Sequence, residues 1–243
     1  MGPIPIVAIF SPDPVRVVMS TSRHTKKGGF YSALLPWLGT GLLTSEGAKW
    51  KSRRRLITPA FHFDILKRFL EVMNEQTDVM VDIIEARSQQ GPVEVTELVT
   101  LCALDIIAET AMGKRIDAQR TKEKNKYVEA VSLAATLISD RMEEPWTAPD
   151  IIYMFTPKGR RNERNLKVLH EFTRGFIRER KALLAQQQLQ SQFDGSEEEI
   201  GKKVRPAFLD ILLAAEEDGK PIDDEDIREE VDTFMFEGTD FFS

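Results

Sequence analysis

The sequence predicts a mainly α-helical protein. Apolar residues recur at intervals of three and four over most of the chain, the spacing that places them on one face of a helix. Capping residues and prolines stand where several of these stretches begin or end, and no series of alternating strands is present. With 243 residues, of which 42% are hydrophobic, the chain can bury one large core or two small ones.

The N-terminal quarter predicts short elements joined by turns. Residues Ile4–Phe10 could form one short strand. A helix with a serine cap and a proline in its first turn is expected over Ser11–Met19. Glycine and aromatic residues predict a loop over Gly28–Gly41, and a helix is expected over Ser45–Thr58, because the next residue is proline.

Longer helices are expected in the middle of the chain. Phe63–Arg87 has the pattern of an amphipathic helix. Val95–Met112 is apolar on most faces, so we expect a buried helix that ends at Gly113. The same apolar spacing predicts helices over Lys122–Arg141 and Asn162–Gln188.

The C-terminal part alternates between polar and apolar segments. Residues 186–204 are rich in glutamine and glutamate and predict a mobile linker. A short helix is expected over Pro206–Ala215, and Asp223 or Asp224 should cap the last helix.

Composition excludes several classes of protein. A net charge of -6 and an isoelectric point near 5.3 argue against a nucleic-acid-binding protein, which usually carries a basic domain. One cysteine excludes a disulfide framework and a multi-cysteine metal site. The longest apolar runs are shorter than the roughly 20 residues that cross a bilayer, so no membrane anchor is expected in this chain.

The last helix carries an unusual glycine. Glu237, Gly238 and Asp240 follow an apolar helical stretch. A glycine inside a helix costs about 1 kcal/mol relative to alanine, which suggests that something packs against the bare backbone. The alternative is a frayed acidic helix end without chemistry.

A basic segment contains an arginine at an apolar position. Four residues at helical spacing share one side of the predicted helix: Trp50, Arg54, Ile57 and Phe61. A buried arginine requires an anionic partner, and its planar guanidinium suits carboxylates. This face could therefore hold an acidic ligand. The alternative is a solvated basic helix on which Arg54 reaches water.

Two other segments have simpler interpretations. Cys102 lies in the most apolar predicted helix and is interpreted as a small core residue, since no histidine or lysine pattern would lower the pKa of its thiol. Lys158–Arg164 is interpreted as a solvated basic turn ahead of a helix, with contact to a membrane surface as the alternative.

Four stretches, in their order along the chain, resemble a cytochrome P450 of family 4. They are similar to the loop before helix C, to helix C with its W-x-x-x-R motif, to helix E and to the central helix I: residues 36–43, 49–63, 104–113 and 230–238. The resemblance implies a mainly α, partial cytochrome P450 fold with helices B to I and little β structure. Residues 1–243 would then form a partial catalytic domain.

The resemblance assigns roles to five residues. Trp50 and Arg54 match the residues that hold the haem propionates, which would be the anionic partner of Arg54. Gly238 matches the helix I glycine beside the oxygen-binding face of the haem. Glu237 matches a glutamate that forms an ester with a haem methyl group in many family members. Asp240 matches the acid that relays protons to bound oxygen.

The resemblance also implies a cofactor and partners. Haem b would be held by a cysteine thiolate that lies outside this chain, and electrons would come from NADPH through NADPH-cytochrome P450 reductase. The substrate would be a lipid-like small molecule such as a fatty acid. The intact family member would lie at the endoplasmic reticulum membrane.

The chain departs from the family pattern at its end. The family expects threonine after Asp240 and commonly histidine before it, whereas this chain has Phe241 and Thr239. We interpret the sequence as about the first half of a catalytic domain, trimmed at both ends and inactive alone. The alternatives are a truncated, non-catalytic helical product that binds lipid or haem weakly, and an unrelated helical scaffold.

Overall fold

The computed structural model describes residues 7–21, 26–121, 125–147, 149–194, 207–218 and 222–240. No residue in these ranges belongs to a strand, which confirms the predicted mainly α fold. The α-helices are α1 (Pro12–Met19), α2 (Leu35–Leu38), α3 (Gly47–Ile57), α4 (Phe63–Ser88), α5 (Thr96–Thr110), α6 (Asn125–Glu143), α7 (Asp150–Phe155), α8 (Pro157–Asp194), α9 (Phe208–Glu217) and α10 (Asp224–Asp240). Short 3-10 helices cover Gly29–Leu34, Thr58–Phe61 and Pro145–Thr147.

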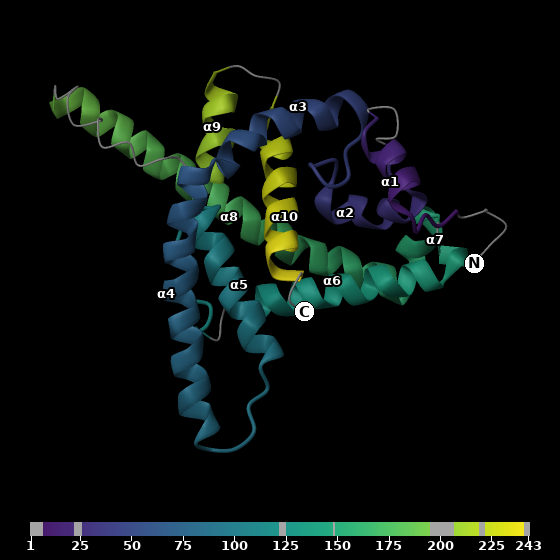
Figure 1. Cartoon of the computed structure of the whole chain (residues 1–243), viewed down its shortest axis with the longest axis horizontal. Helices are drawn as coiled ribbons and strands as arrows, with labels where there is room; N and C mark the ends of the chain where they lie inside the picture. The colour runs from purple at the N-terminus through teal and green to yellow at the C-terminus, as the bar shows by residue number, and fades with distance from the viewer. Residues whose placement is uncertain are drawn as a thin grey trace.

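Helix α10 runs through the middle of the molecule, with α2, α5, α8 and α9 packed around it (Figure 1). Ile227, Val231 and Met235 recur every fourth residue and are fully buried. The predicted cap is confirmed, because Oδ1 of Asp223 accepts a hydrogen bond of 2.8 Å from the N–H of Asp226. The other elements are therefore positioned against a central, well-started helix.

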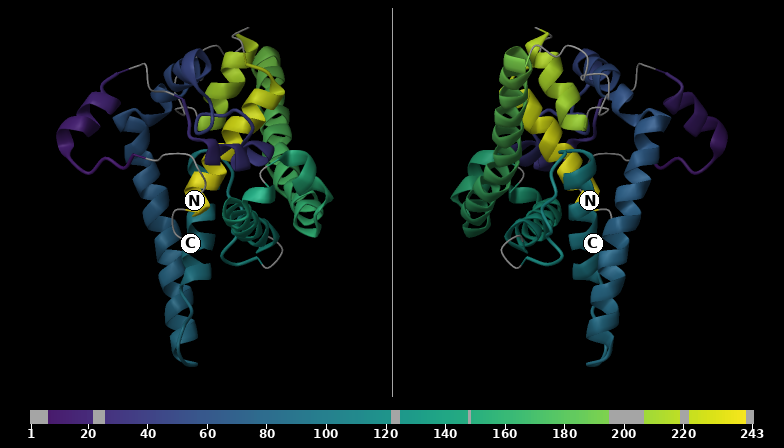
Figure 2. Two further views of the ribbon diagram at one scale, coloured as in Figure 1. Left: turned by 90° about the vertical axis from the view of Figure 1, so that its right-hand side faces the viewer. Right: turned by 90° about the vertical axis from the view of Figure 1, so that its left-hand side faces the viewer.

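Two helix pairs extend from this centre (Figures 1 and 2). Helix α4 packs along α5, and α6 packs along α8. In the second pair the ring of Tyr127 stacks on Phe172, with 4.2 Å between their centroids. Helix α5 is buried on most faces, as its apolar sequence predicted.

The loop predicted over Gly28–Gly41 is wrong for most of its length. A 3-10 helix and α2 occupy Gly29–Leu38. Trp37 and Leu38 of α2 are fully buried, and the ring centroid of Trp37 lies 5.0 Å from that of Phe236 on α10. Burial of these large apolar side chains outweighs the local turn preference of the glycines.

The basic turn predicted over Lys158–Arg164 is also wrong, because this segment lies inside α8. The helix begins at Pro157, and Oγ1 of Thr156 accepts a hydrogen bond of 2.9 Å from the N–H of Gly159. A threonine cap followed by proline is a standard helix start, so the sequence carried this signal. The short helix α7, just before it, was not predicted.

Two further predictions are only partly covered by the described residues. Residues 7–10 of the expected strand Ile4–Phe10 are not in a strand, and residues 1–6 lie outside the described ranges. Residues 186–194 of the expected linker 186–204 continue α8, since glutamine and glutamate are good helix formers. Residues 195–204 lie outside the described ranges.

The turn between α2 and α3 rests directly on α10. Gly39 has a φ of 55°, and a Cβ on it would lie 1.9 Å from Oε1 of Glu229. A Cβ on Gly41 would lie 2.6 Å from Oγ1 of Thr233 and 2.7 Å from the carbonyl oxygen of Glu229. The backbone of this turn can approach α10 only because both positions lack a side chain.

Gly41→Ala is expected to lower the free energy of unfolding by about 1–3 kcal/mol, because the added methyl group overpacks the contact with α10. Gly175→Ala on α8 is the control, since a Cβ there meets nothing within 4 Å. The control should be neutral or stabilise by up to about 1 kcal/mol. Denaturant unfolding measures both variants, and equal stabilities would contradict the close contact.

Candidate functional site

The structure brings Trp50, Arg54 and Glu237 to one pocket of about 280 Å³. Trp50 and Arg54 lie one turn apart on α3, and Glu237 lies in the last turns of α10. Helices from opposite ends of the chain therefore meet at this pocket. We take it as the candidate functional site because three of the five predicted site residues line it.

The pocket combines apolar walls with basic edges. Leu42, Leu43 and Phe234 supply apolar surface, while Lys27 and Arg54 supply cations and Trp50 an indole N–H. Such a donor set suits a flat, apolar ligand that carries carboxylates. Lys27 was missed by the sequence analysis, because it lies outside every helical pattern.

Of the two interpretations of Arg54, the structure agrees with the solvated one, because the neighbouring Arg53 takes the buried position. Arg53 is 5% exposed, and its Nη2 lies 2.5 Å from Oδ2 of Asp226 on α10. Arg54 is exposed, and no carboxylate among the described residues pairs with it. The α3 face that packs inward is set by Arg53 and Ile57, one turn apart and both buried. The guanidinium of Arg54 consequently remains available to a ligand.

The bare backbone at Gly238 packs against a neighbouring helix. A Cβ on Gly238 would lie 2.8 Å from Cγ1 and 3.0 Å from Cβ of Ile107 on α5. The expected close approach therefore occurs, and Ile107 is the side chain that makes it. Asp240 is the last residue of α10, and its side chain lies outside the described part of the structure.

Glu230 is a buried carboxylate on α10 that the sequence analysis did not identify. Its Oε2 accepts a hydrogen bond of 2.9 Å from the N–H of Leu42, and its Oε1 lies 3.8 Å from Nε of Arg53. Burial raises its pKa to about 7, although the nearby Arg53 and Lys49 oppose this shift. The carboxylate therefore titrates in the physiological range, behind the wall of the pocket.

Asp232 is a second buried carboxylate, two residues further on. Its Oδ2 accepts a hydrogen bond from Nη1 of Arg228, and it lies 3.7 Å from Nε2 of His170. Burial raises the pKa of Asp232 to about 7 and lowers that of His170. Arg228 and His170 also both contact the carbonyl oxygen of Trp37, so this network ties α8 and α10 to α2.

Cys102 lies away from the candidate pocket. It is buried in α5, and its Sγ donates to the carbonyl oxygen of Gln76 at 3.5 Å. Burial raises the pKa of its thiol. These observations agree with the interpretation of Cys102 as a core residue.

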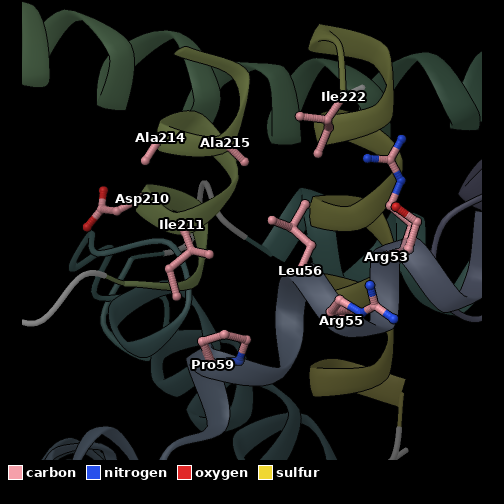
Figure 3. Close-up of a pocket in the computed structure, with 10 residues that line it drawn as sticks. Arg53, Arg55, Leu56, Pro59, Asp210, Ile211, Ala214, Ala215 and Ile222 are labelled. Atoms are coloured by element: carbon pink, nitrogen blue, oxygen red, sulfur yellow. The ribbon is translucent and has the colours of Figure 1, made fainter. Parts of the chain in front are cut away.

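A larger pocket of about 540 Å³ lies between α3 and α9 (Figure 3). Leu56, Ile211 and Ile222 give it an apolar floor, and Arg55 lies at its edge. The carboxylate of Asp210 at the other edge is already bound by Arg180, at 2.6 and 2.8 Å. None of the predicted site residues lines this pocket, so it is not the candidate site.

Exposed apolar side chains gather on α7 and the 3-10 helix before it. Trp146, Ile151, Met154 and Phe155 are 63–73% exposed. The exposed basic residues Arg160 and Arg161 follow at the start of α8. Within the described ranges, no helix has the length and apolar character required to cross a bilayer.

Comparison with known proteins identifies similar sequences over the whole chain. The family model described as Cytochrome P450 matches residues 1–243. Cytochrome P450 4V2 of Pongo abelii is 45% identical over 242 residues, which cover 99% of this chain and 46% of that protein. Cytochrome P450 4d2 of Drosophila melanogaster is 42% identical over 239 residues, covering 96% and 48%. The chain thus spans about half the length of the curated relatives it matches.

Glu230→Gln is expected to flatten the dependence of stability on pH. The pKa of Glu230 rises from 4.5 to about 7 on folding, so the folded chain binds more protons than the unfolded chain between these values. The stability contributed by neutral Glu230 is complete below 4.5 and is lost as the pH rises through about 7. Wild type should therefore weaken between about pH 5 and pH 8, and the variant should weaken less.

Unfolding curves at several pH values measure this slope. Glu171→Gln, at an exposed position of α8, is the control and should keep the wild-type slope. An unchanged slope in Glu230→Gln would contradict the assigned titration.

Proposed function

The chain belongs to the cytochrome P450 family, and we propose that it supplies the haem-propionate site of a family 4 monooxygenase. The whole protein would hydroxylate a hydrophobic substrate such as a fatty acid. The observation that carries this proposal is the meeting of Trp50, Arg54 and Glu237 at one pocket. Because the chain spans about half the length of its relatives, the complete activity is a proposal about the longer protein.

The donor set of the pocket fits haem b. The macrocycle is flat and apolar and would lie against Leu42, Leu43 and Phe234. Its two propionates would accept hydrogen bonds from Trp50 and Arg54. The ammonium group of Lys27, which also lines the pocket, would be a third donor to them. Bound haem supplies the activation of O₂, by which one oxygen atom enters a C–H bond and the other becomes water, with electrons from an NADPH-dependent reductase.

The end of α10 would serve the oxygen-binding side. We propose that Gly238, whose bare backbone Ile107 of α5 contacts, lies next to this face, and that Glu237 is the residue that would carry the ester link to haem found in many family members. Asp240 would hold the proton that is delivered to oxygen. Phe241 has no hydroxyl group to pass that proton on, so Asp240 would depend on water in this chain.

Cys102 cannot serve as the axial ligand in this proposal, because it is buried against Gln76, away from the pocket. It is also the one cysteine of the 243 residues. We therefore expect these residues alone to bind haem without thiolate ligation and without monooxygenase activity. This same observation favours the second candidate function, a non-catalytic helical product that binds haem weakly.

A membrane surface is proposed as a partner of the exposed patch formed by Trp146, Ile151, Met154 and Phe155. Large apolar side chains next to exposed arginines are typical of segments that enter the interface of anionic bilayers. For the intact family member we propose a location at the endoplasmic reticulum membrane. The lipid-like substrate would be drawn from the same phase.

Arg54→Ala is expected to weaken haem binding by about tenfold, because a propionate loses a charge-assisted hydrogen bond. Arg55→Ala should change affinity by less than about twofold, since Arg55 points about 100° around the helix and lines the other pocket. Haem titration followed by quenching of tryptophan fluorescence measures both. Haem dimethyl ester, which lacks the two charges, should bind wild type and Arg54→Ala equally.

If Arg54→Ala and Arg55→Ala weaken haem binding by the same factor, the assignment of Arg54 to a propionate is wrong.

Replacing Ile151 and Phe155 by serine is expected to reduce sedimentation of the chain with anionic phosphatidylserine vesicles by about fivefold or more, because apolar area no longer enters the interface. Val81→Ser on α4 is the matched control, since Val81 is 52% exposed but lies outside the patch. Equal loss in both variants would indicate non-specific adhesion.

A further inference from the structure

Helix α3 is fastened to α10 by a set of titratable side chains that we call the α3–α10 clamp: Lys49, Arg53, Asp226, Glu229 and Glu230. Nζ of Lys49 lies 2.9 Å from Oδ1 of Asp226 and 3.3 Å from Oε2 of Glu229. Arg53 reaches the other oxygen of Asp226 at 2.5 Å. Two cations of α3 thus share one carboxylate of α10.

The turn before α3 joins the same clamp. Oγ1 of Thr40 donates to Oε2 of Glu229 at 3.0 Å and accepts from Nζ of Lys49 at 2.5 Å. The N–H of Leu42 donates to Oε2 of Glu230 at 2.9 Å. The clamp therefore holds the turn, α3 and α10 at one point.

The centre of the α3–α10 clamp is buried, so its side chains have little freedom to rearrange. Arg53 is 5% exposed and Glu230 is fully buried. Buried ion pairs gain little net stability, because both charges lose their hydration, but they are costly to break once formed. Their consequence is a defined arrangement of the helices that carry them.

The three elements held by the clamp are also the three walls of the candidate pocket. The turn supplies Leu42 and Leu43, α3 supplies Trp50 and Arg54, and α10 supplies the wall opposite. Arg53 immediately precedes Arg54, so a fixed Arg53 turns Arg54 about 100° around the helix, toward the pocket.

We infer that the α3–α10 clamp positions Trp50 and Arg54 for a bound dicarboxylate, with Arg53 as the positioning residue and Asp226 as its anchor. This inference rests on the proposed haem function and adds the residues that determine affinity without touching the ligand. By reciprocity, haem binding stabilises the clamp, so it also slows hydrogen exchange at the amide of Leu42.

The test is a set of haem titrations of the 243-residue chain. Arg53→Met keeps the length and apolar stem of the side chain but loses the ion pair, and it is expected to weaken haem binding by about tenfold, as loss of outer-shell partners does elsewhere. Asp226→Asn should weaken binding in the same direction. Arg53→Lys retains a cation but not the guanidinium that reaches both Asp226 and Glu230, so it should weaken binding by less than Arg53→Met does.

A combined variant separates positioning from general damage. If Arg53 acts through Trp50 and Arg54, then Arg53→Met should change affinity by less than about twofold in a background that already carries Trp50→Phe and Arg54→Ala. The same factor of weakening in both backgrounds would overturn the inference, because it would indicate a merely structural role. Circular dichroism of each variant checks that the helices persist, and Asp226→Asn repeats the test from the α10 side.

Different results would contradict the haem-site proposal and the clamp inference. If Arg54→Ala weakens haem binding and neither Arg53→Met nor Asp226→Asn does, the clamp inference is overturned and the haem site stands. If Arg54→Ala binds haem as wild type does, the haem site is wrong and the clamp inference falls with it. Slower exchange of the Leu42 amide in the presence of haem supports the inference, and unchanged exchange opposes it.

Discussion

The burial of carboxylates along α10 is the constraint on which the rest of the structure depends. Glu230 and Asp232 are fully buried, and Asp226 is partly buried, on a helix that also buries three large apolar side chains in the core. A buried charge without partners costs far more than one hydrogen bond contributes, so each carboxylate needs donors from a neighbouring element. Arg53 pairs with Asp226, and the N–H of Leu42 donates to Glu230. Arg228 and His170 lie against Asp232.

This requirement gives α3 two sides with different roles. Lys49 and Arg53 face α10 and are used by its carboxylates, whereas Trp50 and Arg54 are turned toward the pocket. A rotation of about 100° around the helix thus separates Arg53, which holds the fold, from Arg54, which can hold a ligand. The arrangement explains how an acidic chain with a net charge of -6 presents a basic edge, since part of its excess carboxylate is paired internally.

The sequence predicted the helical class and most of the long helices because their apolar periodicity is strong. It could not determine which side of α3 faces α10. Arg53 and Arg54 are the same residue type at adjacent positions, and only the packing of the helix decides that Arg53 is the buried one. The helix at Trp37 was missed because its stability comes from contact with Phe236, far away in the chain. The meeting of Trp50 and Glu237 came from a family resemblance, and no local pattern could have placed Lys27 beside them.

The glycines near α10 extend the same argument to the backbone. Gly39 and Gly41 let a turn lie against Glu229 and Thr233, and Gly238 lets Ile107 of α5 lie against the end of the helix. Each of these glycines lets a neighbouring element approach α10 more closely than a larger residue would allow. A substitution at Gly39 or Gly41 would displace a wall of the pocket while leaving Trp50, Arg54 and Glu237 in the sequence. Contacts near both ends of α10 therefore set the position of the helix that carries Phe234 and Glu237 to the pocket.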